Sequence, residues 1–157
     1  MDSSTKKKLI VALFVIFLLL RLFISAPFRL TADSLKFLEL SGNFPQHTLY
    51  NGQLYLQHPP LYPYLIHFIS LLFNDDYIAA ILISLLSACI TFFVLYKLFM
   101  LLTNDFKVTF AVLLFFTLSV EFVATAYKPV RESFMVMAIL STVYFYAKGV
   151  KLNDKES

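Results

Sequence analysis

Acidic and basic side chains gather in two short stretches of an otherwise largely apolar chain. The first, TADSLKFLELSG, carries Asp33 near its start. The second, EFVATAYKPVRES, carries four charged residues: Glu121, Lys128, Arg131 and Glu132. Lysine and arginine can hold a phosphate, and a nearby carboxylate can take a proton from a hydroxyl group. The two stretches could therefore supply a general base and a phosphate-binding cluster.

Each stretch also has a purely structural interpretation. Asp33 follows Thr31 at the start of an amphipathic pattern that stops at Gly42, so its carboxylate could cap a short helix. Lys128 and Arg131 could extend to a membrane surface as interfacial anchors, with capping acids beside them. Glu121 lies within an apolar run, where an ionisable group is usually paired or functional. The residues leave both interpretations open.

The elements that position these residues are predicted to lie in lipid. Hydrophobic residues make up 59% of the 157 residues and charged residues 15%, more apolar surface than one small water-soluble domain can bury. The net charge of +3 does not indicate nucleic-acid binding, because the basic residues flank apolar runs instead of forming one polar surface. Cys89 is the only cysteine, so an internal disulfide is excluded. We predict an all-α, polytopic membrane protein.

Four apolar runs come close to the roughly 20 residues that cross a bilayer. A secretory signal peptide also begins with lysines, but Arg21 inside the first run disfavours that interpretation. No internal repeat is visible, and we treat 1–157 as a single membrane domain. The predicted spans are 9–26, 77–102, 108–126 and 131–148.

A long loop, 27–76, is predicted between the first two spans. It contains the amphipathic pattern 31–42 and a second apolar run, 61–73, which is too short to cross a bilayer and follows Pro59 and Pro60. We expect two juxtamembrane helices in this loop. Their place at one membrane surface makes the loop the expected location of function.

Basic residues set the predicted orientation. If both termini are cytoplasmic, the inside receives more lysines than the outside at every crossing, as the positive-inside rule requires. We therefore expect a multi-pass protein of the cell membrane with 27–76 on the outer face. The inner set is Lys6, Lys7, Lys8, Lys97, Lys107, Lys148, Lys151 and Lys155, and the outer set is Arg29, Lys36, Lys128 and Arg131.

The order of these features resembles the start of GT-C membrane glycosyltransferases, in particular the group of protein O-mannosyltransferases and aminoarabinose transferases. In that family the first external loop carries an acid soon after the first span and an HPPLY-like entry into a juxtamembrane helix. A later external loop carries an arginine followed by an acid. Here the matching residues are Asp33, the HPPLY stretch at 58–62, and Arg131 with Glu132. The resemblance covers 8–148.

The resemblance implies transfer of a sugar from a polyprenyl-phosphate donor to an acceptor hydroxyl at the outer face. Asp33 would be the general base and Glu132 would assist it, while Arg131 and Lys128 would hold the departing lipid phosphate. His58 would contact substrate or cap the helix that its prolines begin. We add Glu121 to the substrate-binding group from its position in the second stretch. Metal dependence stays open, with a divalent cation as one candidate cofactor.

Only the front of such an enzyme is present in the resemblance, because family members are much longer and have more spans. The second acid that often neighbours the family's first acid is Ser34 here. We therefore expect a truncated enzyme that needs a chain supplying the remaining spans. A non-catalytic scaffold or partner subunit is the alternative. Transport is disfavoured, since Gly and Pro do not break the spans at mid-depth.

Overall fold

The computed structural model describes residues 2–23, 31–42, 49–50, 53–54, 61–125 and 131–156. Within these ranges the chain is helical apart from short turns and one antiparallel pair of two-residue strands, β1 (Leu49–Tyr50) and β2 (Gln53–Leu54). The predicted all-α class is confirmed. The helices are α1 (Ser3–Phe23), α2 (Ala32–Gly42), α3 (Leu61–Phe73), α4 (Asp76–Thr103), α5 (Phe106–Leu118), α6 (Val120–Thr125) and α7 (Glu132–Glu156).

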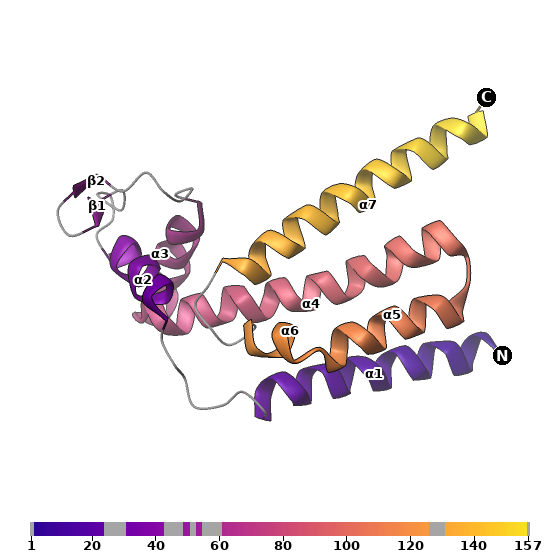
Figure 1. Ribbon diagram of the computed structural model, residues 1–157, viewed down its shortest axis with the longest axis horizontal. Helices are drawn as coiled ribbons and strands as arrows, with labels where there is room; N and C mark the ends of the chain where they lie inside the picture. The colour runs from indigo at the N-terminus through magenta and orange to yellow at the C-terminus, as the bar shows by residue number, and fades with distance from the viewer. Residues whose placement is uncertain are drawn as a thin grey trace.

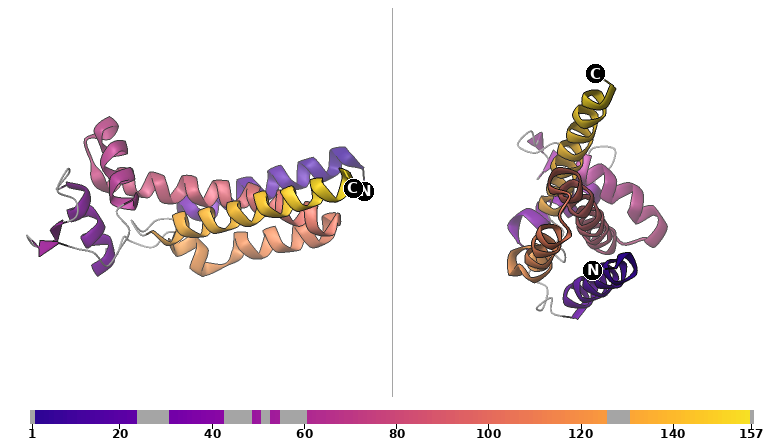
Figure 2. Two further views of the ribbon diagram at one scale, coloured as in Figure 1. Left: turned by 90° about the horizontal axis from the view of Figure 1, so that it is seen from above. Right: turned by 90° about the vertical axis from the view of Figure 1, so that its right-hand side faces the viewer.

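The long helices run along the long axis of the molecule, and the short helices α2 and α3 lie at the end opposite both termini (Figure 1). Figure 2 shows the two termini at the same end when the molecule is turned. Along the chain, α1 leads away from that end, α4 returns, α5 and α6 lead away again, and α7 returns (Figure 1). α4 is central because it packs against α3, α5 and α7.

Among the residues that the structure describes, two helices are long and apolar enough to cross a membrane: α4 and the Glu132–Leu152 part of α7. α1 has 21 residues but includes Lys6, Lys7, Lys8 and Arg21, and α5 has only 13 residues. Crossing by α1 and by α5 with α6 therefore remains a prediction. The chain is an all-helical membrane protein.

The third predicted span is interrupted, although it contains no Gly or Pro. α5 ends at Leu118, Ser119 takes an extended conformation with φ −65° and ψ 116°, and α6 follows. The Ser119 N–H donates to the Phe115 carbonyl (2.9 Å), and the Ser119 carbonyl accepts the Val123 N–H (3.0 Å). Because both neighbouring helices keep hydrogen bonds to Ser119, the break leaves few backbone groups without partners.

Other boundaries differ less from the prediction. The helix at 61–73 lies where it was expected, and α4 extends the predicted 77–102 by one residue at each end. α1 begins at Ser3, before the expected 9, and α7 continues past 148 to Glu156. Helix formation therefore continues into the polar flanks of the apolar runs, whose lysines and glutamates are good helix formers.

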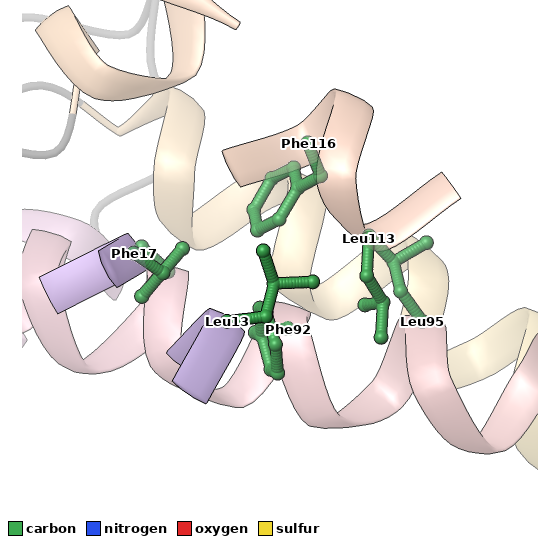
Figure 3. Close-up of a cluster of buried hydrophobic side chains, with 7 residues drawn as sticks. Leu13, Phe17, Phe92, Leu95, Leu113 and Phe116 are labelled. Carbon is green, nitrogen blue, oxygen red and sulfur yellow. The ribbon is translucent and has the colours of Figure 1, made fainter. Parts of the chain in front are cut away.

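Buried side chains form two separate clusters. The central cluster joins α1, α4 and α5, and its aromatic rings are close to one another, with 5.2 Å between the Phe17 and Phe92 centroids (Figure 3). The end cluster joins α2, α3 and the start of α4. The central cluster contains Leu13, Phe17, Ala88, Phe92, Leu95, Leu113 and Phe116, and the end cluster contains Phe37, Tyr62, Ile66, Ala79, Ala80 and Ile83.

Tight turns at both ends of α4 fix the helices around it. Asp75 is its N-cap, with Oδ1 accepting the N–H groups of Tyr77 (2.8 Å) and Ile78 (3.0 Å). Asn74 and Asn104 both adopt the left-handed conformation with φ 52°, which asparagine tolerates better than most residues. These turns bring α3 back onto the start of α4 and α5 back onto its end.

Candidate functional site

Asp33 lies in the first turn of α2 but does not cap it. The hydroxyl oxygen of Thr31 accepts the Ser34 N–H at 3.2 Å, so Thr31 is the capping residue. The Asp33 side chain is 55% exposed and forms an ion pair with Lys36, at 3.4 Å. An exposed pair of this kind contributes little to stability. Of the two roles left open by the sequence, the structural one belongs to Thr31.

α2 is held against its neighbours just beyond Asp33. Phe37, one turn later, is buried and packs edge-on against Tyr62, with 5.2 Å between ring centroids. At the other end of α2, the Ser41 hydroxyl lies 3.1 Å from Asp76 Oδ2 and its carbonyl oxygen lies 3.1 Å from His67 Nδ1. His67 therefore joins α3 to α2.

The second predicted acid, Glu132, is the exposed first residue of α7. Arg131 precedes it, half-buried, and its carbonyl accepts the Met135 N–H at 2.8 Å, which begins the helix. Two residues on, Phe134 packs on the end cluster, with its ring centroid 6.3 Å from that of Tyr62. The rings of Phe37, Tyr62 and Phe134 therefore connect the helix of Asp33 to the helix that starts at Glu132.

The pKa of Tyr62 reflects this environment. Burial raises the pKa of Tyr62 to about 12, a hydrogen bond with Ser84 at 3.4 Å opposes that rise, and the negative charge of Glu132 adds to it. An electrostatic effect of Glu132 on a ring of the end cluster agrees with the packing of Phe134. The start of α7 therefore lies close to α3.

Glu121 is placed differently from what the apolar run suggested. The break at Ser119 puts it in the first turn of α6, and its side chain is exposed. His58 and Lys128 lie outside the described residues. Within the part of the chain that the structure describes, no group of three His, Cys, Asp or Glu side chains is arranged to hold a metal ion.

Sequence reasoning used Arg21 only against a signal peptide and missed its structural position. Its side chain is fully buried, with 0% exposure. Nη1 donates to the Phe17 carbonyl and Nη2 to the Phe116 carbonyl, both at 3.4 Å. The guanidinium carbon also lies 3.6 Å from the Phe17 ring centroid, a cation–π geometry. A lone arginine inside an apolar run is the signal that could have identified it.

Arg21 ties α1 to the end of α5. Phe116 lies in the last turn of α5, where carbonyl groups lose their partners within the helix. Among the described residues, Arg21 Nε and the Thr117 hydroxyl are buried without a hydrogen-bond partner. The arginine therefore stabilises the chain just before the break, and the segment after the break leads to Arg131 and Glu132.

An apolar helical body with a pair of short helices at one end is the arrangement expected for the front part of a GT-C membrane glycosyltransferase. The family model described as dolichyl-phosphate-mannose-protein mannosyltransferase matches residues 57–156, and the chain belongs to this family. The match includes Arg131 and Glu132 but begins after Asp33. Comparison with curated proteins and with solved structures gives no match.

Proposed function

We propose that this chain forms the N-terminal part of a glycosyltransferase that uses a polyprenyl-phosphate sugar at the outer face of the cell membrane. Membership of the dolichyl-phosphate-mannose-protein mannosyltransferase family carries this proposal. In such a reaction the acceptor hydroxyl attacks the anomeric carbon of the sugar, the bond from that carbon to the phosphate oxygen breaks, and the hydroxyl proton passes to a base.

Asp33 is the proposed base. Its carboxylate is exposed at the polar end of the molecule, and the cap of α2 is provided by Thr31 instead. The ion pair with Lys36 is exposed and weak, so an incoming hydroxyl can replace it. The buried Phe37, one turn away, fixes the backbone that carries the carboxylate. An anchored helix would hold the carboxylate in a fixed position, which supports its assignment as the base.

Arg131 and Lys128 are the proposed phosphate clamp, and Glu132 orients Arg131 or the acceptor. Arg131 directly precedes α7, beside a helix end connected by Phe134 to the end cluster. A guanidinium there stabilises the charge that develops on the leaving phosphate. Glu121, exposed on α6, and His58 are proposed contacts to the substrate.

The proposed orientation puts both termini in the cytoplasm and four crossings in the membrane. The end of the molecule that carries the termini is rich in lysine: Lys6 lies over the Phe106 ring, and Lys151 donates to the Leu101 carbonyl at 2.6 Å. The helices that lie or begin towards the opposite end (Figure 1) include α2 with Asp33, α4 with its N-cap Asp75 and α7 with its first residue Glu132, and Glu121 lies in α6. Basic residues favour the cytoplasmic side.

We propose further that activity needs helices from a partner chain. Only 6% of the apolar part of α7 is buried, against 50% of that of α4. The largest contact of α7 is with α4, and its other surfaces expose Ile139, Phe145 and Tyr146. A donor with a long polyprenyl tail requires an apolar groove, and a partner helix beside α7 would form one.

Sugar transfer in membranes tests these proposals. Membranes containing the chain alone, or the chain with the product of the neighbouring gene, receive radiolabelled polyprenyl-phosphate sugars, and labelled acceptor is measured. We expect transfer only with the partner and a loss of about 10²–10⁴-fold in Asp33→Asn. Asp105→Asn, the same change at the opposite end, serves as the control. Transfer by the chain alone would refute the partner requirement. Full activity of Asp33→Asn would show that Asp33 is not the base. No transfer with any partner would favour a non-catalytic subunit.

A further inference from the structure

A cavity lies at the end of the molecule that carries the termini, far from the proposed glycosyl-transfer site. It has a volume of about 650 Å³ and lies between the start of α1 and the turn from α4 to α5. Both elements contribute polar and apolar residues to its lining. The lining residues are Lys6, Leu9, Asn104, Asp105, Phe106, Lys107 and Phe110.

The turn beside the cavity has its backbone groups largely satisfied. Asp105 caps α5, with Oδ1 accepting the Lys107 N–H at 2.7 Å. The Asn104 N–H donates to the Met100 carbonyl at 3.2 Å, which closes the end of α4. The main chain here is therefore fixed by its own hydrogen bonds, and Lys6 and Lys107 are the cationic residues among those that line the cavity.

Lys6 is directed towards this turn. Its Nζ lies 5.6 Å from the centroid of Phe106, whose side chain is buried. A cation–π contact of this kind holds an ammonium group beside the turn without neutralising its charge. Two lysines and one carboxylate line the cavity, and one oxygen of that carboxylate is already engaged in capping. The cavity therefore has a net positive charge.

The remaining wall is apolar. Leu9 lies one turn after Lys6 on α1, and Phe110 lies one turn after Phe106 on α5, where it packs against the central cluster. A positive rim above an apolar wall, at the end of membrane helices, has the chemistry of a phospholipid rather than of a soluble anion. The rim matches a phosphate and the wall matches the first part of an acyl chain.

We propose that this cavity binds an anionic phospholipid, with the headgroup phosphate between Lys6 and Lys107 and an acyl chain against Leu9 and Phe110. Under the proposed orientation the site faces the cytoplasmic leaflet, where anionic lipids give the surface its negative potential. The site makes no use of Asp33 or Arg131. Lipid binding can thus succeed or fail independently of sugar transfer.

Native mass spectrometry of the full chain, released from nanodiscs of equal phosphatidylglycerol and phosphatidylcholine, tests the proposal. The measured quantity is the ratio of the two lipids that stays bound. We expect phosphatidylglycerol to be preferred, and the preference to fall about fivefold for each lysine removed in K6Q/K107Q. K7Q/K8Q is the matched control, because it removes the same charge from exposed lysines of the same helix and should keep the preference. K6R/K107R, which retains both cations, should also keep it.

Circular dichroism verifies that each variant remains helical. If K7Q/K8Q lost the preference for phosphatidylglycerol to the same extent, the lipid would be attracted diffusely to basic residues, and a specific site would be overturned. An unchanged preference in K6Q/K107Q would overturn it as well. Displacement of phosphatidylglycerol by soluble glycerol phosphate at matched concentration would show that a free anion is the ligand, because the acyl wall would then contribute nothing.

Discussion

The central cluster and the end cluster use similar side chains in different solvents. In the proposed orientation the central cluster lies within lipid, where Phe17 and Phe92 gain little from leaving an environment as apolar as themselves, so close packing must hold them. The end cluster lies among polar groups, and burial of Phe37 and Ile66 there gains from the hydrophobic effect. Stability of the two regions should therefore respond to different perturbations.

The polar contacts of the two regions support this difference. The end cluster is surrounded by hydrogen bonds between elements, from Ser41 to Asp76, from His67 to the Ser41 carbonyl and from Tyr62 to Ser84. In the central cluster a long-range polar contact of this kind runs from Arg21 to the Phe116 carbonyl. The position of α2, which carries Asp33, thus depends on the end cluster, the region that water can reach in the proposed orientation.

The largest loss of stability is expected from Phe37→Ala, and Phe17→Ala is the variant with which it is compared. Loss of a buried phenylalanine ring from a core in a protein region surrounded by water costs about 3–5 kcal/mol, and the same loss from the cluster proposed to lie in the membrane should cost less because acyl chains replace water as the competing solvent. Hydrogen exchange in nanodiscs measures both losses of stability. Exchange in α2 and α3 reports on Phe37→Ala, and exchange in α1 reports on Phe17→Ala.

Leu35→Ala is the control for Phe37→Ala, because Leu35 is exposed on the same helix. It should leave hydrogen exchange in α2 and α3 nearly unchanged. Equal protection losses for Phe37→Ala and Phe17→Ala would mean that the two clusters are stabilised in the same way.

An intermediate loss of stability is expected when Tyr62 ionises at alkaline pH. Its pKa is about 12 in the folded protein against 10.0 ordinarily, so the unfolded phenol ionises first as pH rises. Below pH 10 the contribution of Tyr62 to stability is fully present, and between pH 10 and 12 it falls by about 2–3 kcal/mol. Tyr62→Phe should lack this part of the pH dependence, which chemical unfolding at several pH values measures.

Phenolate absorbance provides a direct readout for the same residue. The difference between the titrations of the parent and Tyr62→Phe should show one tyrosine that ionises late, near pH 12. A difference curve centred near pH 10 would contradict the burial of Tyr62 in the end cluster.

The smallest effect is expected from Asp75→Ala, which removes the N-cap of α4. Loss of a capping side chain costs about 1 kcal/mol, and the change should increase hydrogen exchange in the first turn of α4 beside the end cluster. Asp75→Asn retains a capping oxygen and should stay close to the parent. Asp105→Ala removes the cap of α5 at the other end and should affect that end alone; an effect that spreads to both ends would mean that the clusters unfold together.

Much of the fold follows from local signals. The prolines before 61–73 and the aspartates at 75 and 76 mark helix boundaries by the hydrogen bonds they lack or supply, and α3 and α4 lie where these residues indicate. Thr31 and Gly42 similarly bound α2. The break at Ser119 was not predictable in this way, because it carries no helix-breaking residue and Arg21 contacts the carbonyl beside it from another helix.

For the candidate site, too, local sequence signals indicated some features, and others depend on the folded structure. Residue types and order indicated Asp33, Arg131 and Glu132, and topology indicated one end of the molecule. Whether Asp33 or Thr31 caps α2 depends on the backbone conformation at one turn, to which both residue types are suited. The electrostatic effect of Glu132 on Tyr62 depends on packing between helices about 70 residues apart, beyond the reach of local sequence patterns.

Arg21 also has a consequence for the order in which the protein is assembled. Its two carbonyl partners become available at very different times during synthesis, since Phe17 lies four residues before it and Phe116 lies 95 residues after it. In the proposed topology α1 and α5 both cross the membrane, so when α1 first leaves the ribosome the guanidinium has only its own helix to bond, and a charged group within lipid is costly. The first helix is thus expected to stay near the aqueous channel of the insertion machinery until α5 has been made, so that the membrane integrates α1 and α5 as a pair.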